Sequence, residues 1–131
     1  MFMKHITLLI AVVLVGVLGS TAAANHSTAA AYRLDATQVL QGTVVMVAFK
    51  QPHTYVHVEG LDRKGVMRRW SLEWADATAL ARHGVTRSTL RAGDQVRVVG
   101  HPGRNADAYQ MLIVQMIRAA DGWSWGTSSD E

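Results

Sequence analysis

The sequence predicts an all-β domain with one short helix, a five-stranded Greek-key barrel of the oligonucleotide/oligosaccharide-binding (OB) type. Five segments between residues 39 and 118 are rich in β-branched and alternating apolar residues, which is typical of strands. A short helical segment lies between the third and fourth of them. This is the element order of the OB barrel, which binds its ligand on the outer face of the second and third strands and in the adjoining loops.

The first strand is expected over residues 39–49, where apolar residues occupy both parities. A long strand that bends at Gly42 and serves two parts of a barrel would have this pattern. Pro52 cannot donate a hydrogen bond to a β-ladder. We therefore expect the first loop at residues 50–53.

The second and third strands, at residues 54–60 and 66–74, form the clearest hairpin. Residues 62–65 have the composition of a type I turn with Gly65 in the left-handed conformation, which opposes Asp62 to Val66 and fixes the register. With this register, apolar residues pair on the inner face and acidic residues meet basic ones on the outer face. The predicted pairs are Val58 with Trp70, Val56 with Leu72, His57 with Ser71, Glu59 with Arg69, and Tyr55 with Glu73. Trp70 and Trp74 are therefore expected in the core with Leu72.

A short helix is predicted over residues 76–84. Asp76 is suited to the N-cap and Gly84 to the position after the last turn. Leu80 is the one large apolar side chain in the segment, so we expect the helix to plug a barrel end rather than form a layer. The remaining predicted elements are a fourth strand at 95–99, a polar loop at 101–107 and a fifth strand at 109–118.

The first residues of the chain are typical of a secretory signal. A short basic start precedes an apolar run at 6–19, and small residues follow with an Ala-x-Ala site at Ala22–Ala24. A membrane anchor would need about 20 apolar residues, and this run is shorter. The predicted organisation is a signal peptide at 1–24 cleaved after Ala23 or Ala24, a flexible lead-in at 25–36, the barrel at 37–120 and a tail at 121–131. The location expected from it is periplasmic or secreted.

The composition limits the classes of partner. The 131 residues include 13 Lys and Arg against 10 Asp and Glu, a formal net charge of +3 that loss of Lys4 with the leader lowers by one. This bias is too small to indicate binding to nucleic acid or to an anionic membrane. Cysteine is absent, which excludes disulfides and thiol chemistry. The hydrophobic core must therefore stabilise the fold without covalent help.

The outer face of the second and third strands and the loops beside it hold the candidate ligand-binding residues. They are His53, Tyr55, His57, Arg69, Glu73, His101 and Arg104. His53, Tyr55 and Glu73 are expected to converge at one end of this face, where they could bind a polar ligand. The alternative is that these are ordinary outward residues of a half-exposed sheet, with Glu59 and Arg69 in an exposed ion pair that contributes little to stability.

A divalent metal is the one cofactor for which the sequence offers candidate ligands. His53 and His57 share a strand face, but four strand residues span about 13 Å. Two imidazole nitrogens must each lie within about 2.1 Å of a shared metal, so these two cannot bind one ion. His53 and His101 could meet if their loops lie at the same barrel edge, with Glu73 as a third ligand.

Several motifs in combination resemble one family. They are Gln51-Pro52-His53, Trp70-Ser71-Leu72-Glu73, the segments 79–84 and 88–94, and Val99-Gly100-His101-Pro102. The combination resembles a family of small secreted bacterial proteins catalogued as a domain of unknown function, number 6152, over nearly all of the mature chain. Members commonly have Asn-Pro-His where this chain has Gln51-Pro52-His53. The resemblance implies a periplasmic β-barrel domain and supplies no catalytic residue.

The expected function is a non-enzymatic periplasmic module that binds an unidentified small molecule or envelope protein. One alternative is a metal-binding protein that uses His53 and His101, and another is a structural or interaction domain that docks through strand edges or the tail with Trp123 and Trp125. Ser71 opposite His57 lacks the strained elbow and oxyanion hole of a hydrolase. Export and the small net charge oppose a nucleic-acid partner, and no membrane insertion is expected after cleavage.

Overall fold

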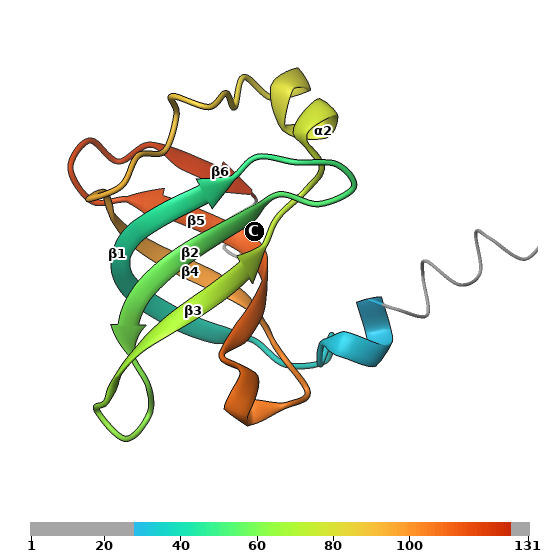
Figure 1. Ribbon diagram of the computed structural model, residues 1–131, viewed down its shortest axis with the longest axis vertical. Coiled ribbons are helices and arrows are strands. Elements are labelled where there is room, and N and C mark those ends of the chain that lie inside the picture. The colour runs from blue at the N-terminus through green and yellow to red at the C-terminus, as the bar shows by residue number, and fades with distance from the viewer. Residues whose placement is uncertain (1–27, 127–131) are drawn as a thin grey trace, which may run out of the picture. The chain divides into compact units, whose positions relative to one another are not determined.

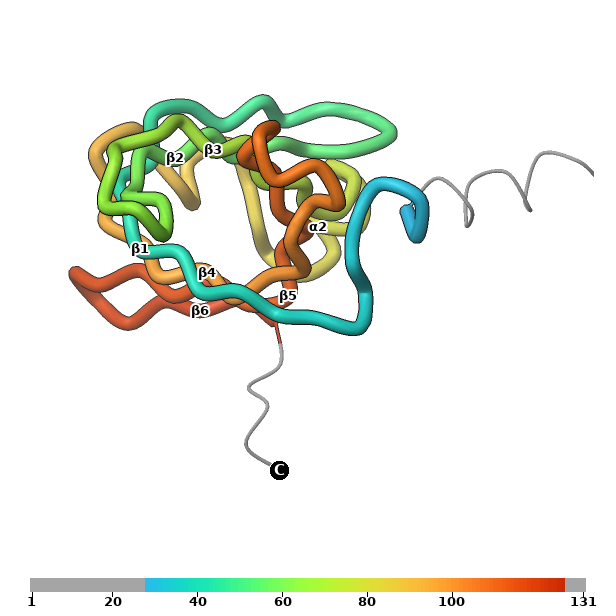
Figure 2. Tube along the Cα trace, turned by 90° about the horizontal axis from the view of Figure 1, so that it is seen from below, coloured from blue at the N-terminus to red at the C-terminus, as the bar shows by residue number. Residues whose placement is uncertain are grey.

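Five strands close into a barrel in the computed structural model, which describes residues 28–126. They are β1 (Gln38–Ala48), β2 (Tyr55–Leu61), β3 (Met67–Glu73), β4 (Gln95–Pro102) and β5 (Gln110–Arg118). β1 pairs antiparallel with both β2 and β4, and a parallel pairing of β3 with β5 closes the ring, as Figure 1 and Figure 2 show. Helix α2 (Ala77–Arg82) lies between β3 and β4, and the 3-10 turn η1 (Ala106–Ala108) joins β4 to β5. The predicted all-β, OB-like barrel is confirmed.

Three predicted segments reach beyond the described residues. The predicted signal peptide at 1–24, the first part of the predicted lead-in, 25–27, and the last part of the predicted tail, 127–131, lie outside them. In residues 28–126, no helix is long and apolar enough to cross a membrane.

The barrel interior is filled by large apolar side chains from every barrel strand. Trp70 and Leu72 of β3 are buried together with Trp74, as their inward parity predicts. Burial of one such side chain contributes about 1.5–3 kcal/mol. The core therefore supplies the stability of a chain that has no disulfides.

Helix α2 covers one end of the barrel through a single anchor. Asp76 caps it by accepting a hydrogen bond from the Ala79 amide at 2.8 Å. Gly84, with a φ of 76°, follows its last turn. Leu80 is fully buried and is the one buried residue of the helix, so the predicted plug is confirmed.

The β2–β3 hairpin has the predicted turn and register. The Gly65 amide donates to the Asp62 carbonyl at 3.0 Å, the Asp62 amide donates to the Val66 carbonyl at 2.8 Å, and the φ of Gly65 is 77°. All five predicted pairs are formed across the two strands. Four residues of turn chemistry therefore determine which side chains point inward and which point outward.

The irregularity in β1 lies further along the strand than predicted. Gly42 stays in regular register with Gly60 of β2 and Val96 of β4, while the register with β2 shifts between Val44 and Met46. The extra residue forms a bulge that increases the local twist and lets one strand serve both neighbours. Gly42 is required for a different reason, because a Cβ there would lie 2.3 Å from the Glu59 carbonyl oxygen.

β4 is longer than predicted. His101 and Pro102 were expected in a loop, but they extend β4 and pair with Leu112 and Met111 of β5. Proline ends a ladder only where its missing N–H is needed. At this strand end the Pro102 carbonyl accepts a hydrogen bond from the Arg33 amide at 2.9 Å, so the proline still takes part in pairing.

Two segments outside the five barrel strands, residues 31–37 and 124–126, pair with the barrel. Residues 31–37, here called the N-terminal strap, form an isolated antiparallel bridge between Tyr32 and Gly103. Residues 124–126, expected in a tail, form strand β6 (Ser124–Gly126), which pairs antiparallel with β5. Trp123 and Trp125 meet the Trp74 ring edge-on, with centroid distances of 6.4 and 5.4 Å.

Candidate functional site

Three of the predicted site residues meet at one end of the outer face. Tyr55 pairs with Glu73 across β2 and β3. The His53 Nδ1 atom lies 3.4 Å from the Glu73 Oε1 atom, with the histidine side chain half-exposed and the carboxylate 12% exposed. The convergence expected from the strand register is therefore present.

The N-terminal strap already occupies this end of the face. Tyr32 is 5% exposed, and its hydroxyl hydrogen-bonds to the Glu73 carboxylate. Burial, and then the neighbouring carboxylate, raise the pKa of Tyr32 well above its usual range, and the same two causes raise the pKa of Tyr55. Glu73 thus holds the strap on the barrel. The sequence contained a signal for this contact, because Tyr32 is the one aromatic residue in the predicted lead-in.

The remaining predicted residues do not join this cluster. His57 lies opposite Ser71, and Arg69 lies 3.9 Å from Glu59 in a pair whose side chains are both more than half exposed. Such pairs contribute little to stability. Arg104 lies in the connection from β4 to β5, where its amide donates to the Ala31 carbonyl at 2.9 Å.

The placement of His101 differs from the premise of the metal hypothesis. The start of β1 pairs with the end of β4, and the end of β1 leads into the loop that carries His53. His101 pairs with Leu112 of β5, and Leu112 pairs with Glu73 of β3, so one strand lies between His101 and Glu73. His101 Nδ1 is 2.7 Å from the Ala36 carbonyl oxygen, so this ring holds the strap. Residues 28–126 contain no group of three or more His, Asp or Glu side chains that could hold a metal ion.

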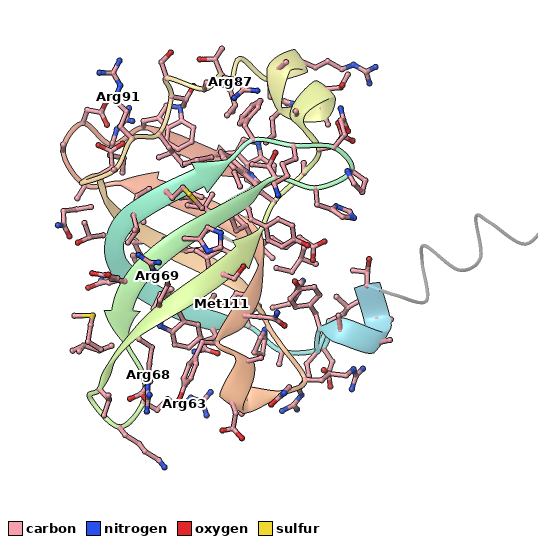
Figure 3. The ribbon with its side chains drawn as sticks, viewed as in Figure 1. Arg63, Arg68, Arg69, Arg87, Arg91 and Met111 are labelled. Carbon is pink, nitrogen blue, oxygen red and sulfur yellow. The ribbon has the colours of Figure 1, made fainter. Side chains whose placement is uncertain are left out.

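A pocket of about 370 Å³ lies at the end of the barrel where the hairpin turn meets the β4–β5 connection, and we call it the barrel-end pocket. Three segments far apart in the sequence line it: the strap and the start of β1 (33–38), the hairpin (62–70) and the β4–β5 connection (102–110). Figure 3 shows Arg63 and Arg68 at this end of the barrel, near the hairpin tip. Its volume is that of a small-molecule site.

Two aromatic rings and a guanidinium form one side of the pocket. The Trp70 and Tyr109 rings meet edge-on at 5.3 Å, and the Arg68 guanidinium carbon lies 4.9 Å from the Tyr109 ring centroid. The Trp70 indole donates to the Gly60 carbonyl at 3.2 Å. Tyr109 has a φ of 49°, a left-handed conformation that costs a non-glycine residue roughly 1–3 kcal/mol. Packing therefore holds this tyrosine in place against local strain.

Backbone pairing aligns two further arginines. The Tyr32–Gly103 bridge is flanked by a hydrogen bond from the Arg33 amide to the Pro102 carbonyl and another from the Arg104 amide to the Ala31 carbonyl, both 2.9 Å. Side chains alternate along paired strands, so Arg33 and Arg104 lie on the face opposite Tyr32. Both line the pocket, while Tyr32 is buried on the other side.

Asp62 organises the hairpin wall of the pocket. Its Oδ1 atom accepts from the amides of Lys64 and Val66, both at 2.9 Å, and its Oδ2 atom accepts from Arg68 Nε at 3.1 Å. The Val66 amide, and then the Arg68 guanidinium and the Lys64 amide, lower the pKa of Asp62. This carboxylate therefore stays ionised and is already occupied by internal donors.

A family model described as a family of unknown function, DUF6152, matches residues 13–111. The chain belongs to the DUF6152 family. The matched part of this DUF6152 protein includes all three segments that line the barrel-end pocket and ends before β6. A search of curated proteins finds no match.

Of the residues that line the barrel-end pocket of this DUF6152 protein, only Arg104 was among the predicted site residues, and the pocket itself was not predicted. The cations at 63, 64 and 68 stand close together in the sequence, and this run was a usable signal. Arg33 gave no such signal, because the sequence does not reveal that the strap crosses the β4–β5 connection. The pocket depends on that long-range contact.

Proposed function

We propose that this DUF6152 protein is a non-enzymatic binding module that holds a small molecule in its barrel-end pocket. The observation that carries the proposal is the pocket's construction: three distant segments converge on a space of about 370 Å³, with Trp70, Tyr109 and Arg68 packed together along it. Small-molecule sites combine apolar rings with a few placed polar groups in this way. The outer-face cluster is a weaker candidate, since Tyr32 already uses the Glu73 carboxylate.

The chemistry of the pocket lining favours binding over catalysis. Among the described residues that line it, none is histidine, cysteine or serine. The arginines keep their protons throughout the physiological pH range, so they hold a ligand but do not exchange protons with it. Fixed charges beside aromatic rings are suited to binding a ligand.

A blocking substitution tests the proposal. Ala106 is exposed in η1 and lines the pocket, so Ala106→Trp would fill the space without removing a charge. We expect compounds that raise the melting temperature of the purified protein in a metabolite screen to lose that effect in this variant. Ala81→Trp, on exposed α2, is the matched control. The proposal fails if every stabilising compound acts equally on both variants.

We further propose that the module acts outside the cytoplasm after export. The support is the basic start, apolar run and Ala-x-Ala site at the beginning of the chain. Mass spectrometry of the protein recovered from cells should give a chain that begins at Asn25 or at Ala24. A recovered chain that retains Met1 and fractionates with the cytoplasm would contradict export.

A further inference from the structure

We propose that the ligand of the barrel-end pocket is a compact polyanion, a small molecule with at least two carboxylate or phosphate groups. This inference rests on the proposed function, because it names the chemical class that the same pocket would take. The charge of the pocket, the placement of its cations and the small counter-charge from the protein's own acids support it.

The pocket concentrates positive charge. Five cationic side chains line it against the two carboxylates of Asp62 and Asp107, which leaves an excess of three positive charges. The formal net charge of the whole chain is also +3. The other charges of the molecule therefore nearly balance, and the excess lies around one concave site. A concave surface lined by charges of one sign focuses the field and raises the local concentration of counter-ions.

The cations stand on two walls of the pocket. Arg33 and Arg104 come from the bridge between the strap and the β4–β5 connection, and Arg63, Lys64 and Arg68 come from the hairpin. A ligand with a single anionic group can neutralise one wall. A ligand with two or more such groups can contact both, and guanidinium groups bind carboxylate and phosphate oxygens in a bidentate manner.

The protein's own acids leave most of this charge uncompensated. Asp62 is engaged by two backbone amides and by Arg68. None of the ion pairs found in the described part of the chain involves Arg33, Arg63 or Lys64. A bound polyanion would therefore supply the counter-charge that the fold does not provide for these three side chains.

Calorimetric titration of the purified protein with four probes tests whether the ligand is a polyanion. Citrate and pyrophosphate are the carboxylate and phosphate arms, glucose is the neutral probe and spermidine the cationic one. We expect at least one polyanion to bind and both other probes to show no heat of binding. Arg33→Gln should weaken polyanion binding about tenfold, the effect of one lost charge-assisted contact. Arg91→Gln makes the same charge change at the opposite end of the barrel (Figure 3) and should change the affinity less than about twofold, because salt screens distant charges.

The outcomes separate the two proposals. The polyanion class is overturned if glucose or spermidine binds and loses binding in Ala106→Trp while citrate and pyrophosphate do not bind, and the pocket function then stands. It is also overturned if Arg33→Gln and Arg91→Gln weaken binding equally, since the attraction is then nonspecific. If Ala106→Trp leaves all binding unchanged, the pocket is not the site and both proposals fail.

Discussion

The side chain of Arg118 contacts three segments that are separate in the sequence. Its guanidinium donates to both oxygens of Asp121 at 2.9 Å and to the Thr89 carbonyl, lies 3.4 Å from Asp94, and stacks over the Trp123 ring at 5.4 Å. It therefore joins the β5–β6 turn to the start of β4 and to the segment after α2. The hydrogen bonds from Arg118 and the Trp123 amide lower the pKa of Asp121 from 3.8 to about 2.

This pKa shift makes stability depend on pH. A carboxyl whose folded pKa is depressed stabilises the fold above its unfolded pKa, and that contribution is lost as pH falls through the folded value. We therefore expect the urea midpoint to fall between pH 4 and pH 2, and Asp121→Asn to reduce the size of that fall. Asp35→Asn, at an exposed position without a described ion pair, is the control. Equal pH profiles for wild type and Asp121→Asn would contradict the assignment.

Gly42 marks a close approach of β1 and β2. A Cβ there would lie 2.3 Å from the Glu59 carbonyl oxygen and 2.6 Å from a Val58 methyl carbon. We expect Gly42→Ala to destabilise the protein by about 1–3 kcal/mol in urea denaturation, the usual cost of overpacking. Gly65→Asn is the contrasting variant, because that site is open and asparagine tolerates a positive φ. A Gly42→Ala variant as stable as wild type would show that β1 and β2 can separate freely.

At the scale of elements, the N-terminal strap links the outer-face cluster to the barrel-end pocket. Tyr32 binds Glu73, the His101 ring meets the Ala36 carbonyl, and Arg33 between them lines the pocket. The outer-face cluster that was predicted as a binding site therefore anchors the strap, and the strap forms part of the wall of the barrel-end pocket. Loosening the strap should affect both stability and binding.

Substitutions at Tyr32 test this connection. Tyr32→Ala removes a buried ring and should cost about 3 kcal/mol, while Tyr32→Phe loses one hydrogen bond and should cost about 1 kcal/mol. Hydrogen exchange at residues 31–37 should accelerate strongly in the alanine variant and slightly in the phenylalanine variant. Unchanged exchange in Tyr32→Ala would show that the strap is held elsewhere.

The elements differ in how far local sequence determines them. The hairpin was predicted residue by residue because Asp62 and Gly65 fix the turn, and period-two alternation then fixes the register. Helix α2 was predicted from its cap and stop residues. The strap and β6 depend on contacts between distant segments, and neither segment has a strand pattern of its own. Pro102 was wrongly expected in a loop, because a proline at a strand end still offers its carbonyl as an acceptor.

At the scale of the whole molecule, the residues of the apolar core and those of the proposed binding pocket are largely different. The apolar interior and the helix plug hold the fold, while five cationic side chains and the strained Tyr109 line the pocket at the hairpin end. Those residues come from three segments that pack together only in the folded protein. This separation explains why the fold was predictable from apolar periodicity, whereas the pocket required the long-range contacts of the strap.

The most direct test of this account is an amide chemical-shift titration of the isotope-labelled protein with citrate. We predict that the shifted resonances belong to residues 33–38, 62–70 and 102–110, the three segments that line the barrel-end pocket. Arg33→Gln should reduce these shifts at each citrate concentration. Shifts centred on His53, Tyr55 and Glu73, or no shifts at all, would contradict the account.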